Sequence, residues 1–484
     1  RCEGSWMKVL LVNPPRFDGI PVIREERCEI TERYSVIEPY SLLQIGALLR
    51  IQGCKVSLVD MNGFGLEYGT LRTALQVEKP DAVIFRFTPT TFDWDMKTAE
   101  IVKENDVGTR TIGICWTLRT MGERVLEQSP ALDIYIRHEY ETVAPQLVST
   151  LESTSDLERL QGIAYRHNDE VKITEDADPL KDYDSMPIPA FDLLPSIGPY
   201  YVTAPAGKPF SILYTSKGCP FKCSFCTVAG TEWKPRSADR IIEELRYLKR
   251  SYGLRTASFF DETFTLDRNR VIHLSKALVE EDLDINWYCN TRAHLIDREL
   301  LSIMRKAGCR GISYGIESGS QKILDSSTKH LKVEQARNAV AWAKEAGIKT
   351  FCSFIFGLPG ENWDTVQETL DFVKETLPTS AQFNVAVPYP GTRFYDDVCR
   401  DKATEELDFR LLFQDDAIVG TAALKPADLN HARSVAYRSL YLNPLWWSSN
   451  VRHVLRNPDD FELALRYAIK ITDNFLLHRM KHAH

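Results

Sequence analysis

The chain has 484 residues, enough for about three domains of roughly 150 residues each. Its composition, 44% apolar and 26% charged, is typical of a soluble globular protein. The net charge of −8 argues against a general nucleic-acid binder. No run of about 18 apolar residues predicts a membrane span.

The first residues are polar and do not resemble a signal peptide. Residues 1–6, ahead of Met7, are interpreted as an addition made for expression, and they are left out of the fold prediction. Eleven cysteines without a secretory signal predict a reducing, cytoplasmic location.

Strands and helices alternate in the N-terminal half. Residues 7–16 are expected to form a buried strand that runs into a proline-stopped loop, and residues 39–52 a helix that Gly53 ends. Further strands are expected at residues 55–60, 81–87, 110–115 and 133–136. This alternation predicts βαβ units and a parallel sheet, whose ligands bind at the carboxyl ends of the strands. The loops at that edge would be residues 13–16, 88–91 and 116–119.

The middle and second half of the chain give a different pattern. Residues 151–208 are expected to be a connector, with small strands at 162–166 and 170–173 and then a proline-rich stretch. Ser237 should cap a helix that ends at Gly253 and leads into another strand. Two later helices end in Ala-Gly and also lead into apolar strands. Such βα repeats favour a barrel with its chemistry at the carboxyl ends of the strands.

Beyond residue 401 the sequence predicts a helical region. Residues 440–447 and 461–477 are expected to form amphipathic helices. Trp446 and Trp447 are interpreted as core or lid residues rather than as a substrate-binding pair.

Three cysteines, Cys219, Cys223 and Cys226, lie within eight residues, directly after the apolar run at 210–214. Thiolates at this spacing can converge on one metal centre. Iron–sulfur clusters normally take four cysteines, and zinc would need a fourth Cys or His. A disulfide would leave one cysteine over and would need an oxidising compartment. Cysteine can also be an ordinary small apolar residue of the core. That interpretation fits these three poorly, because the segment around them is rich in Gly, Pro, Lys and Ser.

The spacing Cys-x3-Cys-x-Phe-Cys, with Phe225 before the last cysteine and a strand before the first, resembles the signature of the radical S-adenosylmethionine (SAM) enzymes. In that family three cysteines hold a [4Fe–4S] cluster, and the amino and carboxylate groups of SAM chelate the fourth iron. The resemblance explains why three ligands suffice. It implies a partial (β/α)6 barrel over residues 209–400.

Polar residues stand where the barrel strands are expected to end. Singly, each acid is more typical of a helix cap or a solvated loop, but a zwitterionic ligand needs both an anion and a cation. The resemblance implies that Glu317 and Arg292 contact the polar groups of SAM, with Asp261 or Glu262 near its amino group. The full set of expected SAM contacts is Phe225, Asp261, Glu262, Arg292, Glu317 and Tyr389.

Residues 7–150 are similar to the cobalamin-binding domain that is fused to one branch of the radical SAM enzymes. The similarity rests on the opening Asn-Pro-Pro, the helix–turn–strand at 48–56, and Thr-Pro-Thr after the third strand. Two places depart from the pattern: residues 113–116 replace Gly-Gly-Pro-His, and residues 138–141 replace Gly-Glu-Gly-Glu. The expected cobalamin contacts are Asn13, Pro14, Pro15, Arg16, Thr88, Pro89, Thr90, Thr91, Trp116 and Glu139.

The Asp-x-His-x-x-Gly motif that supplies a histidine to cobalt is absent from this half. His138 is its only histidine and is interpreted as a structural residue. Cobalamin is therefore expected to lack a protein histidine on its lower face. A nucleotide-type fold that holds no cofactor remains the alternative for this domain.

Taken together, the resemblance implies an α/β protein with a Rossmann-like cobalamin-binding domain (7–150), a connector (151–208), a radical SAM barrel (209–400) and a helical C-terminal domain (401–484). It implies a C-methyltransferase. One SAM methylates cob(I)alamin, and a second is cleaved to a 5′-deoxyadenosyl radical that abstracts hydrogen from an unactivated sp3 carbon. That carbon then takes the methyl from methylcobalamin. An external one-electron reductant is required.

The acceptor is expected to be a peptide or protein residue. The overall similarity suggests the archaeal enzymes that C-methylate a glutamine of methyl-coenzyme M reductase. Two other functions stay open. The same cofactors could drive ring closure, ring contraction or rearrangement of a small molecule or lipid, or the chain could be a non-catalytic iron–sulfur or cobalamin sensor. Methylthio transfer is less expected, because the N-terminal half has no second cysteine triad.

Overall fold

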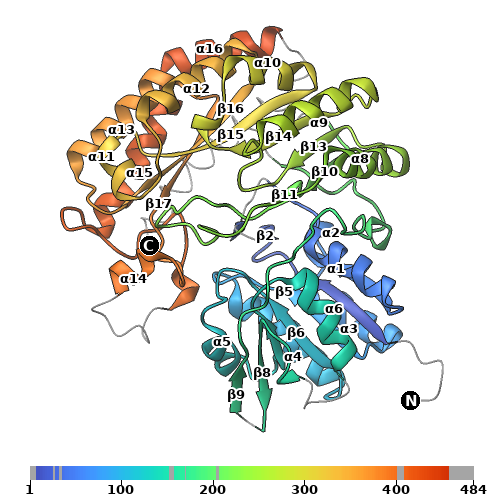
Figure 1. Ribbon diagram of the computed structural model, residues 1–484. Helices are drawn as coiled ribbons and strands as arrows, with labels where there is room; N and C mark the ends of the chain where they lie inside the picture. The colour runs from blue at the N-terminus through green and yellow to red at the C-terminus, as the bar shows by residue number, and fades with distance from the viewer. Residues whose placement is uncertain are drawn as a thin grey trace. The chain divides into compact units, whose positions relative to one another are not determined.

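The computed structural model describes residues 7–25, 28–31, 35–151, 157–168, 170–202, 207–399 and 408–456. The chain divides into two compact units (Figure 1). The first unit takes its described residues from 1–200 and 389–412. The second takes them from 201–388 and 413–484.

The first unit is built on a seven-stranded sheet of order β4-β1-β5-β6-β7-β8-β9. Its first five strands are parallel, and all five were predicted from the sequence. The last two strands add to the sheet antiparallel. The strands are β1 (Lys8–Asn13), β4 (Lys55–Asp60), β5 (Ala82–Arg86), β6 (Arg110–Ile114), β7 (Ile134–Ile136), β8 (Ile163–His167) and β9 (Glu170–Ile173). The strand order reverses between β1 and β5, and in open α/β sheets ligands bind at the carboxyl ends of the strands at such a point.

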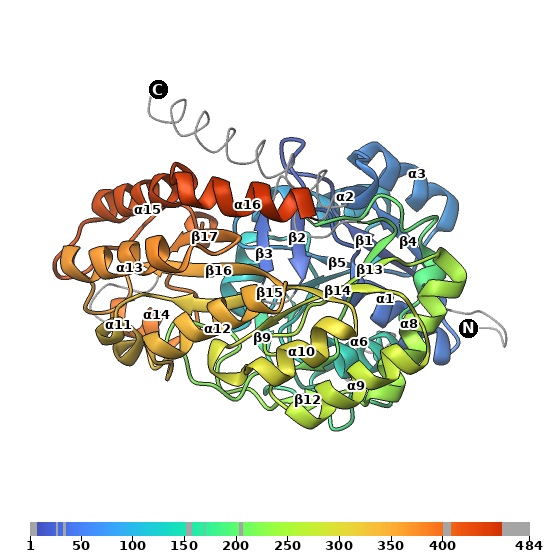
Figure 2. The same ribbon diagram turned by 90° about the horizontal axis from the view of Figure 1, so that it is seen from above.

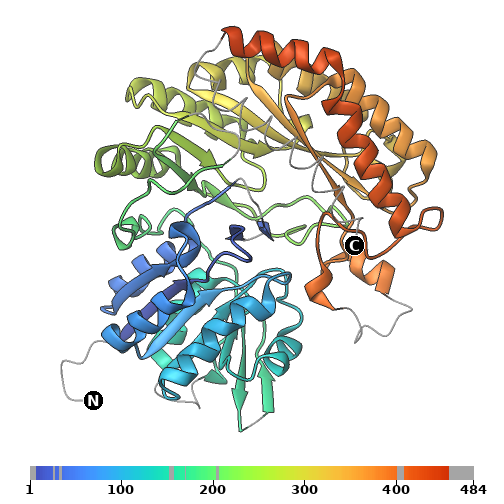
Figure 3. The ribbon, with the colours of Figure 1, turned by 180° about the vertical axis from the view of Figure 1, so that it is seen from behind.

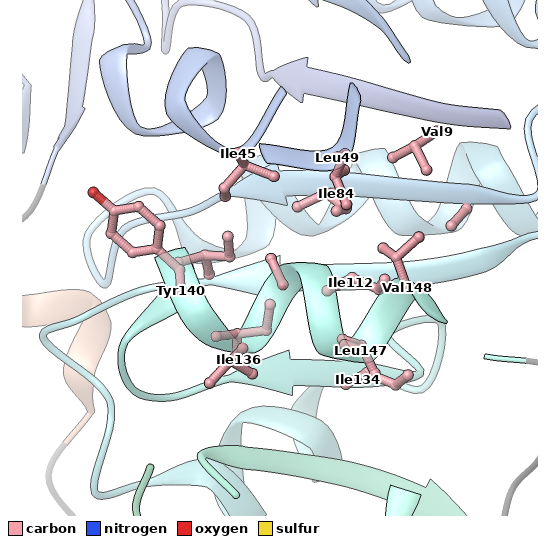
Figure 4. Packing of buried hydrophobic residues seen from close by; sticks show 14 of the residues in the cluster. Val9, Ile45, Leu49, Ile84, Ile112, Ile134, Ile136, Tyr140, Leu147 and Val148 are labelled. Carbon is pink, nitrogen blue, oxygen red and sulfur yellow. The ribbon is translucent and has the colours of Figure 1, made fainter. Parts of the chain in front are cut away.

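Apolar side chains from two helices and the sheet make the core of this unit (Figure 4). The predicted helix at 39–52 is present, and Ile45 and Leu49 on it pack with Leu147 of α6 over Ile84 and Ile112 of the strands. A short antiparallel pair follows the first strand. The helices and that pair are α1 (Tyr40–Ile51), α2 (Met61–Phe64), α3 (Tyr68–Glu78), α4 (Phe92–Asn105), α5 (Gly122–Gln128), α6 (Tyr140–Thr150), η1 (Phe191–Leu193), α14 (Arg393–Cys399), η4 (Phe409–Leu411), β2 (Val22–Glu25) and β3 (Cys28–Thr31).

The predicted connector is part of this unit up to Tyr200. Its two small strands are β8 and β9, which extend the sheet beyond β7. Tyr200, near its end, donates its hydroxyl hydrogen to Asp60 Oδ2 at 2.7 Å, at the carboxyl end of β4. The connector is therefore held to the first sheet by strand pairing and by a buried hydrogen bond.

The second unit is a six-stranded parallel sheet in which each strand pairs with the next along the chain. Helices follow one another along the outside of this sheet (Figure 2). This is the predicted partial barrel. The strands are β10 (Phe210–Leu213), β13 (Thr256–Phe259), β14 (Asn286–Thr291), β15 (Cys309–Glu317), β16 (Lys349–Phe356) and β17 (Ser380–Val385). The helices are α8 (Ala238–Tyr252), α9 (Arg268–Glu280), η2 (Ala293–Leu295), α10 (Arg298–Lys306), α11 (Gln321–Ser326), α12 (Val333–Glu345) and α13 (Trp363–Thr376).

The prediction of one helix over 440–447 is wrong. The stretch spans the end of α15 (Pro426–Tyr441) and the start of α16 (Pro444–Arg456), the red helices of Figure 3. Proline has no N–H to continue a helix but fits the first helical position, so Pro444 ends one helix and begins the next. The helix expected at 461–477 lies outside the described residues, as do residues 1–6.

From residue 413 on, the described tail belongs to the same unit as the barrel, whereas the described residues of 389–412, which include the end of the predicted barrel and the start of the predicted tail, belong to the first unit. The helix α15 lies against β17, and the Tyr441 hydroxyl donates to the carbonyl of Ala381 at 3.1 Å. Trp446 is a core residue that donates its indole N–H to the carbonyl of Pro378, whereas Trp447 is 43% exposed. Among the described helices, none is both long and apolar enough to cross a membrane.

Candidate metal and cofactor sites

The cysteine loop, residues 218–233, leaves β10 and is closed at its neck. There β11 (Ser216–Lys217) pairs antiparallel with β12 (Lys234–Pro235). Gly218 has a φ of +86°, and a Cβ at this position would clash with the carbonyl group of Glu232. Only glycine fits this close approach of the two sides of the loop.

The three predicted metal ligands are thiols on this loop. Cys219 and Cys223 are buried, and Cys226 is partly exposed. The Cys226 N–H donates to the carbonyl of Cys223 at 3.2 Å, and the Cys219 N–H to Thr231 Oγ1 at 2.9 Å. In the part of the chain that the structure describes, no three His, Cys, Asp or Glu side chains are already gathered as a metal site. The fit to an iron–sulfur cluster therefore rests on three donors of the right type on one closed loop.

Asp261, a predicted SAM contact, is fully buried after β13 and holds the start of the cysteine loop. Its Oδ1 accepts the N–H of Thr215 at 2.7 Å. Its Oδ2 accepts the hydroxyls of Thr215 at 2.5 Å and Ser216 at 2.6 Å. Both carboxylate oxygens therefore bind the end of β10, and a contact with SAM stays a prediction. The neighbouring Glu262, also a predicted contact, is only partly buried.

Two buried arginines, which the sequence did not single out, hold the same strand end. Arg236 Nη1 donates to the carbonyl of Tyr214 at 3.2 Å and forms an ion pair with Glu244 at 2.7 Å. Arg270 Nη1 donates to the carbonyl of Thr215 at 3.1 Å. A guanidinium can serve several carbonyl groups at once because it has five donors in a fixed plane. These contacts fix the residues from which the cysteine loop departs.

Arg292 follows β14 and is 5% exposed. Its Nη1 lies 3.2 Å from Cys223 Sγ, so it donates to one of the proposed metal ligands. Its Nη2 donates to the carbonyl of Lys329, and its Cζ lies 4.0 Å from the centroid of the Phe221 ring. The predicted cation of the SAM site is thus in contact with the cysteine loop itself.

Glu317, the predicted anion, is the last residue of β15 and has a φ of +70°. Its Oε1 accepts from Lys329 Nζ at 2.6 Å, and its Oε2 accepts from the Ser353 hydroxyl at 3.4 Å. A Cβ at Gly315 would meet both the Glu317 and Lys329 side chains, so this glycine makes room for the pair. Glu317 and Arg292 are therefore brought together through Lys329.

Sequence reasoning missed Lys329, because it lies in a polar link between α11 and α12 with no strand end or motif to mark it. The structure does mark it. Thr328 and His330, on either side, have φ values of +53° and +50°, a left-handed conformation that residues other than glycine rarely adopt. Such outliers cluster at functional sites.

His294 lies near both Arg292 and Lys329. The pKa of His294 falls to about 4 through burial, and through its proximity to Arg292 and Lys329. The Phe225 ring centroid, another predicted contact, lies 6.0 Å from Lys329 Nζ. Tyr389 belongs to the first unit, and its SAM contact stays a prediction.

The predicted cobalamin contacts lie at the carboxyl edge of the first sheet. Arg24 of β2 donates to the carbonyls of Pro14 and Pro15, each at 3.0 Å. It also forms a fully buried ion pair with Asp95 at 2.7 Å. Arg24 was missed because the Val-Ile pair before it is too short to predict a strand.

Asp95 links Arg24 to the loop that follows β5 at the same edge of the sheet. Its Oδ2 accepts the N–H of Thr88 at 3.1 Å and the hydroxyl of Thr91 at 2.8 Å. The loops after β1 and β5 are therefore joined by one buried ion pair, at the point where the strand order reverses. Asn13 is buried there and donates to Asp60 at 2.8 Å. Pro89 is buried as well, and Thr90 is partly exposed.

The other expected cobalamin contacts also have partners within the protein. Arg16 Nε donates to the carbonyl of Asn62 at 2.9 Å, and Glu139 Oε2 accepts the N–H of Leu180 at 3.1 Å. The Cζ of Arg119 lies 4.7 Å from the Trp116 ring centroid. Their roles toward a cofactor stay predictions.

His138 has a structural environment. Its Nε2 lies 2.9 Å from Asp176, and its ring meets Trp116 edge-on at 5.9 Å. Burial lowers the pKa of His138, which favours the neutral ring. These contacts agree with the interpretation of His138 as a structural residue.

One feature of the first unit argues against a dinucleotide. Helix N-termini bind phosphate in nucleotide-binding folds. Here the first turn of α1 is taken by an internal carboxylate: Glu25 accepts from the N–H of Ser41 at 3.3 Å and from its hydroxyl at 2.8 Å. The first turn of α1, where a dinucleotide-binding fold would hold pyrophosphate, is therefore occupied by Glu25.

Residues 213–373 match the Radical SAM superfamily. The barrel is a radical SAM domain. Its cysteine loop is the segment whose spacing resembled that family, and it lies at the start of the matched region.

The chain is 29% identical to an uncharacterized methyltransferase of Pyrococcus horikoshii over 441 residues, 90% of this chain and 93% of that protein. It is also 29% identical, over 403 residues, to the anaerobic magnesium-protoporphyrin IX monomethyl ester cyclase of Rubrivivax gelatinosus, covering 80% and 70% of the two chains. Among solved structures, the radical SAM methyltransferase TsrM of Kitasatospora setae matches with a TM-score of 0.66 at 17% identity, covering 82% of this chain and 75% of that one.

These similarities confirm the α/β fold class and the resemblance to cobalamin-dependent radical SAM methyltransferases, and with them the interpretation of the chain as an enzyme. They also agree with the expected cofactors, because TsrM was solved with cobalamin and a [4Fe–4S] cluster bound.

Proposed function

We propose that this chain is a cobalamin-dependent radical SAM C-methyltransferase that adds a methyl group to an unactivated sp3 carbon. The observation that carries the proposal is the closed loop with Cys219, Cys223 and Cys226, set beside a buried cation and anion, Arg292 and Glu317. When bound, the cluster, SAM and cobalamin supply reductive cleavage of SAM and transfer of its methyl group, while the protein positions them.

Each unit has its own part in this proposal. In the radical SAM domain, the three thiolates would hold the cluster, and the guanidinium of Arg292 and the carboxylate of Glu317, which accepts from Lys329, would offer opposite charges to the carboxylate and amino groups of SAM. In the first unit, proposed to bind cobalamin through residues 7–150, the loops that Arg24 and Asp95 join form the binding edge. TsrM supports this division, because its fold matches both units and it binds both cofactors.

The cysteine ligands are tested one at a time. Replacing Cys219, Cys223 or Cys226 by Ala should remove the iron–sulfur absorbance and most of the iron, and should abolish formation of 5′-deoxyadenosine from SAM. Cys54→Ala is the matched control, because Cys54 lies in the first unit and should leave iron content unchanged. Equal loss of iron in Cys115→Ala or Cys309→Ala would refute the three-ligand assignment.

The proposed acceptor is a peptide or protein residue, with glutamine as the first candidate. Its support is the mixed surface of the tail. Leu442, Leu445 and Trp447 are exposed there, together with Arg438. Aromatic and arginine side chains are enriched at protein interfaces. The test offers the reconstituted enzyme glutamine-containing and glutamine-free peptides beside a lipid extract from the source organism. Methyl incorporation into the lipid fraction alone would overturn the peptide acceptor.

A second candidate is ring closure without methyl transfer, and the similarity to the cyclase of Rubrivivax gelatinosus favours it. The mass of the product separates the two. Methyl transfer adds one methyl group to the acceptor, whereas ring closure removes hydrogen and adds no carbon. A product without added carbon would replace the proposed function by this one.

A further inference from the structure

Arg292 is a buried cation without a carboxylate. Within the described residues, Lys329 is neutralised by Glu317 at 2.6 Å, but no Asp or Glu forms an ion pair with Arg292. The Arg292 Nε is buried and has no hydrogen-bond partner among those residues. A buried charge is costly unless an opposite charge lies nearby. The group that Arg292 does meet is the sulfur of Cys223, at 3.2 Å.

The guanidinium is held in this position from two further sides. Its Nη2 donates to the carbonyl of Lys329, and the Phe221 ring centroid lies 4.0 Å from Cζ. Rotation away from Cys223 would break the first contact and remove the second. The planar fork of arginine reaches the sulfur and the carbonyl together, which a lysine ammonium on its single stem does not do.

The carbonyl of Lys329 is itself fixed against the cysteine loop. The residue before it, Thr328, has a φ of +53° and donates its hydroxyl hydrogen to the carbonyl of Lys222. Ser327 accepts the N–H of Ser224 at 3.0 Å. The link between α11 and α12 therefore holds both the loop that carries Cys223 and the arginine that donates to Cys223.

We infer that Arg292 raises the reduction potential of the iron–sulfur cluster by donating a charged hydrogen bond to the sulfur of Cys223. The inference rests on the proposed function, which places a cluster on this loop. Reduction adds one electron, supplied by an external reductant, and it breaks no bond. The reduced cluster with its thiolates is more negative than the oxidised one, so the guanidinium stabilises the reduced form more. Hydrogen bonds to the sulfurs and net charge are known to set cluster potentials, and burial strengthens such a bond.

The test is an anaerobic redox titration of the reconstituted full-length protein without SAM, followed by electron paramagnetic resonance (EPR). In Arg292→Gln, the ratio of reduced to oxidised cluster at the wild-type midpoint should fall about tenfold, a shift of about 59 mV for a one-electron couple. Arg292→Lys keeps the charge but loses the planar pair of guanidinium donors. The reduction potential of its cluster should therefore lie between those of the wild type and Arg292→Gln. Arg298→Gln is the control. It also removes one arginine, but its side chain is 64% exposed and pairs with Glu345, so the potential should not move.

A cluster of unchanged potential in Arg292→Gln would overturn the inference and leave the proposed function intact. A wild-type protein that binds no cluster would contradict both. If the Arg292→Gln variant loses its cluster, the hydrogen bond from Arg292 to the cluster is tested in the wild-type protein instead. Pulsed EPR of the reduced protein, grown with and without 15N-arginine, should show a nitrogen coupling that changes with the label. Absence of that coupling would also overturn the inference.

Discussion

Glu361 lies in the loop after β16, and its side chain is almost wholly enclosed, with 1% of the residue exposed. One carboxyl oxygen accepts the N–H of Gly357. The tail contacts the same residue, because the Thr421 hydroxyl donates to the carbonyl of Glu361 at 2.9 Å. Burial raises the pKa of Glu361 to about 8, against the pull of the backbone N–H groups. Below about pH 8 the neutral carboxyl is therefore favoured in the folded protein.

Glu361→Gln should remove a pH dependence of stability. The folded-state pKa is above the unfolded one, so the contribution of the neutral carboxyl is full below the unfolded value of 4.5 and is lost as the pH rises through about 8. Between pH 4.5 and about pH 8, the free energy of unfolding of the wild type should fall by roughly a few kcal/mol relative to that of the variant. Urea unfolding at several pH values measures it. Exposed Glu345→Gln is the control, and identical slopes for wild type and Glu361→Gln would contradict the assignment.

At the scale of elements, the neck of the cysteine loop depends on Asp261. Asp261→Asn keeps the size of the side chain but cannot accept three hydrogen bonds from Thr215 and Ser216 in the same way. Each buried partner left unsatisfied costs about 1–3 kcal/mol. The variant should therefore lose iron to a chelator faster than the wild type. If iron retention were unchanged and only SAM affinity fell, Asp261 would be a SAM contact, as the sequence suggested.

The loops of the first unit depend in the same way on the Arg24–Asp95 ion pair. Removing one partner of a buried pair leaves an uncompensated charge, so Arg24→Met and Asp95→Asn should each cost about 3–5 kcal/mol. The double variant should lose much less than the sum of the two single losses. Cooperative unfolding of the apoprotein, followed by circular dichroism, measures all three. Additive losses would show that the pair does not act as a unit.

The elements that the sequence predicted are those with a strong local signal. The five parallel strands and the barrel repeats follow from apolar runs bounded by Gly and Pro. The tail was mispredicted over 440–447 because an apolar pattern continues across the break at Pro444. Lys329 and Arg24 could not be found in this way. Their contacts join segments far apart in the chain, and nothing in their neighbours' sequence marks them.

Single residues at strand ends show the same limit. The sequence identified Asp261, Arg292 and Glu317 from their positions, and the structure brings Arg292 and Glu317 together through Lys329. The sequence alone could not distinguish a residue that contacts a cofactor from one that supports the cysteine loop. Asp261 and Arg292 both touch the cysteine segment, and only the folded contacts reveal this.

At the scale of the molecule, the described tail from residue 413 on belongs to the same unit as the barrel. The α15 helix lies on β17, and Phe383 of that strand meets Tyr437 edge-on at 5.0 Å. The aromatic residues of α15 therefore serve mainly to pack the tail onto the barrel. The exposed residues at the start of α16 are not used in this packing and are free to contact the proposed acceptor. Substitutions that test acceptor binding can therefore be limited to that surface.

Methyl transfer by the proposed route requires SAM to have two fates. One molecule should donate its methyl group and leave as S-adenosylhomocysteine, and another should be cleaved to 5′-deoxyadenosine. The most direct measurement quantifies both products by mass spectrometry, using the reconstituted protein with cobalamin, a one-electron reductant and an extract that contains the acceptor. We expect equal amounts of the two products, with neither formed by the Cys223→Ala variant. Formation of 5′-deoxyadenosine without S-adenosylhomocysteine would contradict methyl transfer, and formation of neither would contradict an enzymatic function.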